Sequence, residues 1–371
     1  MKILHVIDDL SMGGGQNLLI GLAGIQQKRG NDVTVLVLQP CEDKVVTQKV
    51  EAEGVKVELL SDKVGLHNPL QIFLLMTWLR KYDIVHVHLF PALYWVGFAN
   101  LLTGKRVNVV YTEHSTKNRR RSNPILRRVD NFVYKHCYNK IIACADKALE
   151  TYQQVYPEVK HTCAINNGVD TQKYWAAEPY TKQELLGISE DNFVVTMVAR
   201  FMYMKRQDTI VEAISKLSSK FHACFVGSEP TDEGLLKVKK QAEDLNVSDR
   251  VHFLYIRPDV PRILKTSDVV MMASDYEGLS LSSIEGMAAG KPFIATDVNG
   301  LREIVSGAGE VFENENSDQL AEILTRLESD KEHYSDVVAR CRQRASEYDI
   351  QSMVDQYMNE YEKVIKNKLP N

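Results

Sequence analysis

The chain has 371 residues, 44% of them hydrophobic and 25% charged, and its net charge of −4 divides into +5 over residues 1–170 and −9 over the remainder. This describes an ordinary globular protein that is too long for one compact core, so we expect two domains, the first of which meets an anionic partner. The six cysteines are scattered and form no Cys-x-x-Cys pair, which argues against a disulfide framework and a zinc site. We find no signal peptide and no apolar run long enough to span a membrane, so we expect a cytoplasmic protein that is not secreted.

Short apolar runs alternate with longer helical patterns along the whole chain. The predicted strands are 2–8, 32–39, 55–60, 83–89, 106–113 and 140–145, and then 193–199, 222–227, 250–255, 268–273 and 292–297. Many of these runs are continuously hydrophobic, which is typical of parallel strands buried on both faces. The rhythm breaks once, at 166–170, and a last amphipathic helix is predicted from about 351 to 366. We therefore predict an α/β protein with two doubly wound, Rossmann-like domains that face each other across a cleft.

A glycine loop follows the first predicted strand. Gly13, Gly14 and Gly15 open a helix there, and glycines let a phosphate approach the backbone while the helix start supplies free N–H groups. Leu18 stands where the dinucleotide fingerprint requires its third glycine, so the loop is not that motif. A flexible turn is the alternative interpretation.

Two cations follow the first strand of the second half. Arg200 and Lys205 lie where ligands of an open parallel sheet bind, beyond the carboxyl end of a strand. An arginine fork and a lysine point charge together suit a diphosphate. A solvated basic pair is the alternative.

Two glutamates follow strand 268–273. Glu277 lies in a loop and Glu285 in a short helix predicted over 283–289, and carboxylates of this kind accept hydrogen bonds from sugar hydroxyls, often two at once. The helix dipole would favour a phosphate between them. For Glu285 the pattern Ser282-x-x-Glu285 offers a rival interpretation, a capping box, whereas Glu277 has no comparable structural task.

Two further features carry weaker signals. His86 and His88 lie two apart on one strand, and with no third ligand nearby we expect packing or cleft lining rather than a metal site. The stretch Lys117–Arg128 holds six cations and is followed by Phe132, which fits either a solvated basic face or docking on an anionic membrane surface. Nucleic acid is not expected, because the chain lacks stacking motifs and is acidic overall.

Taken in order, these strings resemble the retaining glycosyltransferases of family 4, the group 1 glycosyltransferases, over nearly the whole chain. The string E-G-L-S-L-S-S-I-E-G-M-A-A-G-K-P from Glu277 to Pro292 is similar to the family's glutamate pair. The resemblance also covers Arg200 and Lys205, the glycine loop, the string from Asn167 to Asp170, and His114 in Tyr-Thr-Glu-His-Ser. Ala199 and Asn299 depart from it, because the family often has glycine at both positions.

The resemblance implies the two-domain GT-B fold, with an acceptor-binding domain over 1–168, a nucleotide-sugar-binding domain over 169–350, and a C-terminal helix over 351–371 that crosses back to the first domain. It implies that Glu285 binds ribose, that Glu277 and His114 contact the donor sugar, and that two cations neutralise the leaving diphosphate. The implied catalytic residues are Glu277, His114, Arg200 and Lys205. The implied donor-binding residues are Gly14, Gly15, Arg200, Lys205, Glu277, Gly278, Leu279, Ser280 and Glu285. No cofactor and no metal are expected, because the cations take the place of a metal.

The function implied is retaining transfer of a hexosyl or N-acetylhexosaminyl group from a nucleotide-sugar, with UDP as the first choice of nucleotide. The expected acceptor is a lipid-linked glycan used in cell-surface polysaccharide synthesis, such as O-antigen or capsule, at the inner face of the plasma membrane. One alternative is a nucleotide-sugar 2-epimerase of the same fold, although we identify no added acid or base for it. A non-catalytic nucleotide-binding partner subunit and, less favoured, an NAD-dependent dehydrogenase are the others.

Overall fold

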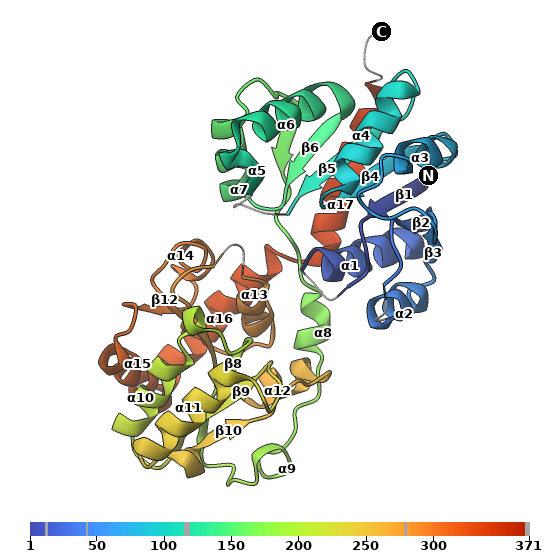
Figure 1. The fold of residues 1–371 in the computed structure, drawn as a ribbon. Coiled ribbons are helices and arrows are strands. Elements are labelled where there is room, and N and C mark those ends of the chain that lie inside the picture. The colour runs from blue at the N-terminus through green and yellow to red at the C-terminus, as the bar shows by residue number, and fades with distance from the viewer. Residues whose placement is uncertain (12–13, 42–43, 115–118, 278–279, 368–371) are drawn as a thin grey trace. The chain divides into compact units, whose positions relative to one another are not determined.

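A computed structural model describes residues 1–11, 14–41, 44–114, 119–277 and 280–367 (Figure 1). These residues form two compact units. The first runs from Met1 to Gly168 and takes up the chain again from Ile350, and the second is Val169–Asp349. Each unit holds one parallel sheet between layers of helices, so the predicted α/β class with two Rossmann-like domains is confirmed.

The described strands of the first unit form a seven-stranded sheet in the order β3-β2-β1-β4-β5-β6-β7. The strands are β1 (Lys2–Ile7), β2 (Asp32–Val37), β3 (Lys56–Leu59), β4 (Ile84–His88), β5 (Val109–Glu113), β6 (Lys140–Ala143) and β7 (Thr162–Ala164). The helices are α1 (Gly14–Lys28), α2 (Val45–Ala52), α3 (Gln71–Leu79), α4 (Ala92–Leu102), α5 (Arg119–Ser122), α6 (Pro124–Cys137), α7 (Asp146–Val155) and α17 (Ile350–Lys366).

Hydrophobic clusters cover both faces of this sheet. Side chains such as Ile3 and Ile7 pack with α1, α2 and α17, while their neighbours Leu4 and Val6 pack with α3, α4, α6 and α7. Successive side chains of a strand point to opposite faces, so strands covered on both sides are apolar at nearly every position. The last helix belongs to the first of these layers, where Tyr357 and Tyr361 are fully buried.

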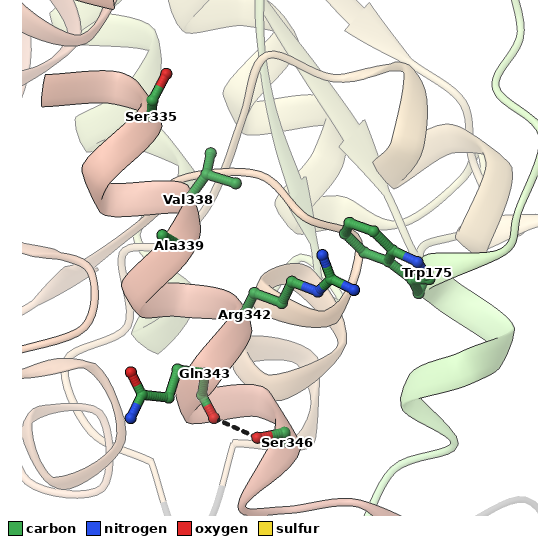
Figure 2. A pocket seen from close by; sticks show the side chains of 7 residues that line it. All are labelled: Trp175, Ser335, Val338, Ala339, Arg342, Gln343 and Ser346. Atoms are coloured by element: carbon green, nitrogen blue, oxygen red, sulfur yellow. Dashed lines mark hydrogen bonds between the residues drawn. The ribbon is translucent and has the colours of Figure 1, made fainter. Parts of the chain in front are cut away.

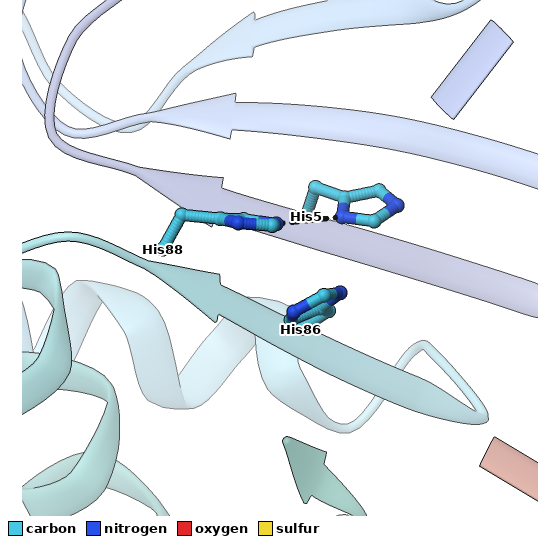
Figure 3. A group of neighbouring side chains, drawn as sticks. All are labelled: His5, His86 and His88. Atoms are coloured by element: carbon cyan, nitrogen blue, oxygen red, sulfur yellow. Dashed lines mark hydrogen bonds between the residues drawn. The ribbon is translucent and has the colours of Figure 1, made fainter. Parts of the chain in front are cut away.

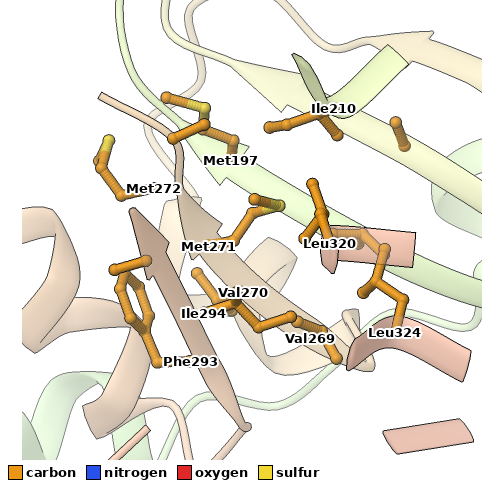
Figure 4. Packing of buried hydrophobic residues seen from close by; sticks show 14 of the residues in the cluster. Met197, Ile210, Val269, Val270, Met271, Met272, Phe293, Ile294, Leu320 and Leu324 are labelled. Atoms are coloured by element: carbon orange, nitrogen blue, oxygen red, sulfur yellow. The ribbon is translucent and has the colours of Figure 1, made fainter. Parts of the chain in front are cut away.

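The described strands of the second unit form a six-stranded parallel sheet in the order β10-β9-β8-β11-β12-β13. They are β8 (Phe193–Val198), β9 (Phe221–Val226), β10 (Val251–Phe253), β11 (Val269–Met272), β12 (Phe293–Thr296) and β13 (Glu310–Phe312). The helices are α8 (Thr171–Trp175), α9 (Lys182–Leu186), α10 (Gln207–Lys216), α11 (Glu233–Asp244), α12 (Val260–Thr266), α13 (Leu281–Ala288), α14 (Arg302–Val305), α15 (Ser317–Ser329) and α16 (Lys331–Ser346), with 3-10 helices η1 (Tyr203–Lys205) and η2 (Ser248–Arg250). Figure 4 shows its core, in which Met271 of β11 and Leu320 of α15 are buried.

All eleven predicted strands are present, and their bounds differ from the prediction by a few residues. Two strands were missed, β7 and β13. Each has three residues, lies at the end of its sheet and is partly exposed. Edge strands of this length carry no continuous apolar run, which is the feature on which the prediction depended.

The start of α13 differs from the prediction in a way that bears on Glu285. The N-cap of α13 is Ser280, whose hydroxyl accepts a hydrogen bond from the Ser283 N–H at 3.3 Å and from the Ser283 hydroxyl at 2.8 Å. Ser282 already lies inside the first turn. The rival interpretation of Glu285 as the partner of Ser282 in a capping box is therefore wrong.

Close packing explains the glycine that follows Glu285. A Cβ atom at Gly286 would lie 2.7 Å from ring carbons of Phe293 and from a methyl group of Val270. Such a distance is too short for real carbon atoms, so only glycine lets α13 approach β11 and β12 this closely. The helix that carries Glu285 is therefore pressed onto the sheet.

The observed cap predicts unequal effects of two serine substitutions. Ser280→Ala removes the N-cap acceptor and is expected to lower the free energy of unfolding by about 1 kcal/mol. Ser282→Ala removes no capping contact and is expected to change it by less than about 0.5 kcal/mol. Urea unfolding of the full chain measures both. Equal losses, or a larger loss for Ser282→Ala, would contradict the assigned cap.

Candidate active site

Two residues predicted to bind the donor lie together in the second unit. The Nζ atom of Lys205 donates to Oε1 of Glu277 at 2.5 Å, and the Ser274 hydroxyl donates to the same oxygen at 2.7 Å. Lys205 follows β8 and Glu277 follows β11, and these strands pair in parallel. Parallel pairing places the carboxyl ends of both strands at one edge, which joins residues 72 positions apart in the sequence.

The pair is mostly shielded from water. Only 19% of the Lys205 side chain and 15% of the Glu277 side chain are exposed. A charge in such a place is costly unless it has a partner, so each of these residues stabilises the other when no ligand is bound. The expectation that Glu277 has no structural task is therefore wrong: it holds Lys205 in place.

Backbone contacts fix the loop that carries Glu277. Its N–H donates to the carbonyl of Asn299 at 3.2 Å, and the N–H of Asp275 donates to the carbonyl of Met204 at 2.8 Å. These bonds tie together the segments that follow β8, β11 and β12. The Asn299 contact uses a backbone carbonyl, so the departure from glycine at this position does not remove it.

Arg200 lies just beyond the end of β8, and its side chain is exposed. Its backbone is held firmly, because the Arg200 carbonyl accepts hydrogen bonds from the Gln207 side chain at 3.1 Å and from the Met202 N–H at 3.0 Å. A cavity of about 570 Å³ adjoins this segment and is lined by Phe201, Met202, Tyr203, Gln207, Asp208, Asp232, Glu233, Gly234, Lys237 and Val238. The arrangement combines a fixed backbone with a guanidinium group that is open to an anion.

Glu285 lies on α13 and is partly buried. Tyr174 of α8 lies beside its carboxylate. Burial raises the pKa of Glu285, and the Tyr174 hydrogen bond and the charge of Lys173 oppose that rise. Asp170 is the N-cap of α8 through a 3.0 Å bond from the Lys173 N–H. The string from Asn167 to Asp170 thus begins the helix that supports Glu285.

Sequence reasoning missed Tyr174, because this residue lies far from Glu285 in the sequence. It also missed Ser274, although this residue lies only three positions before Glu277. Two predicted donor-binding residues, Gly278 and Leu279, lie outside the described residues. Ser280, also predicted for donor binding, is buried and its hydroxyl caps α13. Donor binding by all three stays a prediction.

The predicted residues of the first unit also lie close to one another. Gly14 and Gly15 occupy the first turn of α1. A Cβ atom at Gly15 would lie 3.5 Å from Leu89 and 3.7 Å from the ring of His114. The start of a helix presents N–H groups without intrahelical partners, so this corner suits an anionic group beside His114.

His114 follows β5 and is partly buried. Its Nε2 atom lies 3.1 Å from Nδ1 of His88. Burial lowers the pKa of His114 to about 4, so the ring is neutral at neutral pH. His114 is therefore suited to hydrogen bonding with a ligand and not to acting as a cation.

The two histidines of β4 have a third neighbour, contrary to the prediction. His5 of β1 pairs in register with His86, and ring nitrogens of His5, His86 and His88 all lie within 4.8 Å of one another (Figure 3). The observed strand order places β1 beside β4, an order that we did not specify from the sequence. Burial lowers the pKa of all three rings, that of His5 to about 4.

The basic stretch Lys117–Arg128 is only in part a surface feature. Arg120 pairs with the buried Asp130 at 3.3 Å, and Arg121 pairs with the buried Glu113 at 3.1 Å. The interpretation of the whole stretch as a solvated or docking face is therefore wrong for these two arginines. Lys117 lies outside the described residues.

Among the side chains of this region that the structure describes, those on one face of α6 are exposed. Arg127 and Arg128 are exposed there, as are 71% of Ile125 and 46% of Phe132. Positions 125, 128 and 132 share one side of a helix. In the part of the chain that the structure describes, no helix is both long enough and apolar enough to cross a bilayer.

A shallow cavity of about 480 Å³ runs along α16 (Figure 2). Its lining residues are Trp175, Ser335, Val338, Ala339, Arg342, Gln343 and Ser346. The Arg342 guanidinium carbon lies 3.4 Å from the centre of the Trp175 ring. None of the predicted site residues lines this cavity.

The chain is similar to known proteins over most of its length. The family model described as Glycosyltransferase Family 4 matches residues 12–173, and the model described as Glycosyl transferases group 1 matches residues 181–344. The N-acetyl-alpha-D-glucosaminyl L-malate synthase of Bacillus anthracis is 27% identical over 294 residues, which cover 77% of this chain and 76% of the relative.

A second relative and a solved structure extend this likeness. The UDP-Gal:alpha-D-GlcNAc-diphosphoundecaprenol alpha-1,3-galactosyltransferase of Escherichia coli is 29% identical over 308 residues, which cover 78% of this chain and 77% of the relative. The crystal structure of Anabaena HepE in complex with UDP superposes with a TM-score of 0.83 at 22% identity, over 98% of this chain and 100% of that chain. The chain therefore belongs to glycosyltransferase family 4, and it is a glycosyltransferase with the GT-B fold.

Proposed function

We propose that this enzyme transfers a sugar from a UDP-sugar to a lipid-linked diphosphate acceptor, with retention of the anomeric configuration, in cell-surface polysaccharide synthesis. The observation that carries the proposal is the Lys205–Glu277 pair at the carboxyl ends of β8 and β11, with the exposed Arg200 on the same segment as Lys205. It provides cations for a diphosphate and a carboxylate for a sugar hydroxyl in one place.

The pair suits a change of partners on donor binding. Lys205 and Arg200 would turn to the diphosphate, and Glu277 would then have an oxygen free to accept a hydroxyl of the sugar. Preformed cations stabilise the charge that develops on the leaving diphosphate as the bond to the sugar breaks. Glu285, beside Tyr174, would accept the ribose hydroxyls.

Retention would follow from attack on the face from which the diphosphate departs. The bond between the anomeric carbon and the phosphate oxygen breaks, an oxocarbenium-like centre forms, and the acceptor oxygen bonds to that carbon. The acceptor's proton goes to the departing phosphate oxygen. A trapped covalent glycosyl-enzyme would count against this route.

Relatives and charge support the choice of substrates. HepE was solved with UDP, and the Escherichia coli relative is named for UDP-Gal and a diphosphoundecaprenol acceptor. The excess of positive charge over residues 1–170 and the exposed face of α6 suit an anionic lipid surface. The Bacillus anthracis relative is named for L-malate, which favours a small anionic acceptor as a second candidate.

The first prediction from the proposed function concerns the charged pair. Lys205→Met and Glu277→Gln are each expected to lower kcat with the UDP-sugar by about 100-fold or more, because each removes a group that stabilises the transition state. The double variant should lose less than the product of the single effects, since the two residues act as a unit. Steady-state kinetics measures all three.

Lys220→Met is the matched control for this series. Lys220 is also paired with a glutamate, Glu328, but it precedes β9 and so lies at the opposite edge of the same sheet. Its kcat is expected to equal that of the wild type. Normal turnover in Glu277→Gln would contradict the assignment of Lys205 and Glu277 to the active site. A loss of kcat in Lys220→Met as large as that in Lys205→Met would contradict it as well.

The second prediction concerns the donor and the absence of a metal. With a panel of UDP-, GDP- and ADP-sugars, only UDP-sugars should be hydrolysed slowly or transferred, and UDP should raise the melting temperature. EDTA should leave the rate unchanged, because Arg200 and Lys205 supply the positive charge. If the protein neither hydrolyses a UDP-sugar nor binds UDP, the proposed donor is wrong. Activity that EDTA abolishes and Mg²⁺ restores would contradict metal independence.

The third prediction concerns the exposed face of α6. Reversing Arg127 and Arg128 to glutamate is expected to weaken binding to phosphatidylglycerol vesicles by at least about tenfold, since each basic residue near an anionic surface contributes about 1 kcal/mol. Arg120 and Arg121 are unsuitable targets, because they are buried in ion pairs. Vesicle co-sedimentation measures the binding.

Reversal of Arg80 and Lys81 changes the net charge equally and serves as the control. These two exposed residues follow α3 and precede β4, at the amino end of that strand. Their reversal should leave vesicle binding intact. Binding that neither reversal affects, or that is absent in the wild type, would favour the small anionic acceptor.

A further inference from the structure

A chain of hydrogen-bonded side chains runs from His114 into the sheet of the first unit. Nε2 of His114 lies 3.1 Å from Nδ1 of His88, and Nε2 of His88 lies 3.0 Å from Nδ1 of His5. Nε2 of His5 lies 2.8 Å from the amide oxygen of Gln26 on α1. Figure 3 shows the His5–His88 link between β1 and β4. His5, His88 and Gln26 are completely buried.

The amide of Gln26 gives this chain a direction. Its oxygen can only accept, so His5 carries its proton on Nε2 and offers a lone pair at Nδ1. His88 must then donate from Nε2 and accept at Nδ1, and His114 must donate from Nε2. Each ring thereby takes the tautomer that a free neutral imidazole prefers, and the amide nitrogen of Gln26 points to the Tyr361 hydroxyl at 3.5 Å.

The same contacts argue against a metal ion among His5, His86 and His88. Both nitrogens of His86 have partners, the Tyr361 hydroxyl at 2.6 Å and the Thr112 hydroxyl at 2.7 Å. All six ring nitrogens of the three residues are therefore engaged, and a metal would have to displace several buried hydrogen bonds. Burial keeps the rings neutral, which the chain requires, because a protonated ring has no lone pair to accept with.

We propose that Gln26, His5 and His88 are positioning residues, which hold the proton of His114 on Nε2 and keep its Nδ1 as a hydrogen-bond acceptor for a hydroxyl of the donor sugar. Nδ1 of His114 is the ring nitrogen that lies near Gly15, 3.7 Å from where a Cβ would be. This inference rests on the proposed function only for the identity of the ligand. The proton arrangement itself is a property of the free enzyme.

Nuclear magnetic resonance of the free enzyme with ¹⁵N-labelled histidine rings tests the arrangement directly. Signals are assigned by single histidine substitutions. In the wild type at neutral pH, His114, His88 and His5 should each be protonated at Nε2 and bare at Nδ1. Protonation of His114 at Nδ1, a mixture of tautomers, or displacement of the His5, His86 and His88 signals by added Zn²⁺ would overturn the proposal.

Variants of His88 connect the arrangement to catalysis. His88→Leu removes the acceptor for His114 and should give His114 a mixture of tautomers and lower kcat/KM for the UDP-sugar by about tenfold, the effect of one hydrogen bond. His88→Gln keeps one donor and one acceptor and should restore most of both readouts. His86→Leu is the matched control, equally buried on the same strand, and should change neither the His114 tautomer nor kcat/KM.

Gln26→Met keeps the proposal testable if His88→Leu does not fold, because it removes the terminal acceptor from α1 and should also shift the His114 tautomer. An unchanged tautomer in a folded His88→Leu or Gln26→Met variant would overturn the inference. A tautomer that shifts as expected while UDP-sugar turnover stays unchanged would refute only the contact between His114 and the sugar. Absence of any UDP-sugar activity in the wild type, with the expected tautomers present, would refute only the proposed donor.

Discussion

Parallel strand order is the constraint on which the rest of this structure depends. Each strand is followed by a crossover that returns to the same starting edge, so every loop after a strand lies at the opposite, carboxyl edge. In the second unit this edge collects Lys205 from β8 with Glu277 and Ser274 from β11. In the first unit it collects Gly15 from α1, Leu89 from β4 and His114 from β5. Distant residues thus become neighbours without any local signal in the sequence.

Partial burial sets the state of the charged groups at these edges. Lys205 and Glu277 neutralise each other where water is largely excluded, and Arg120 and Arg121 do the same with Asp130 and Glu113. Arg200 differs, because its side chain is exposed. An unpaired buried charge costs far more than an exposed one, so the shielded Lys205 is held in an ion pair whereas the Arg200 guanidinium is open to solvent. Under the proposed function, donor binding would exchange the Lys205–Glu277 ion pair for ion pairs with the diphosphate.

The first unit contains polar histidine rings buried inside a hydrophobic sheet, where each ring nitrogen needs a hydrogen-bond partner. His5, His86 and His88 are fully buried between strands that are otherwise apolar. They remain there because each ring nitrogen has a partner and because the rings stay neutral. Buried polar networks of this kind are stable only when every member is satisfied. The same requirement makes the proton positions in the chain interdependent, and His114 lies at the end that reaches the carboxyl edge.

The sequence by itself determined the α/β class, eleven of the strands, the last helix and the family, since continuous apolar runs and ordered motifs are local properties of the chain. It also placed Arg200, Lys205, Glu277, His114 and Gly15 after strands, because loop positions follow from strand positions. Tertiary structure alone decided their partners. Ser280 rather than Ser282 caps α13, Tyr174 lies beside Glu285, His5 joins His88, and Arg120 turns inward. Hydrogen bonds and ion pairs between residues far apart in the sequence depend on which strands become neighbours and on how much water remains between the side chains. The local spacing of residues along the chain specifies neither of these.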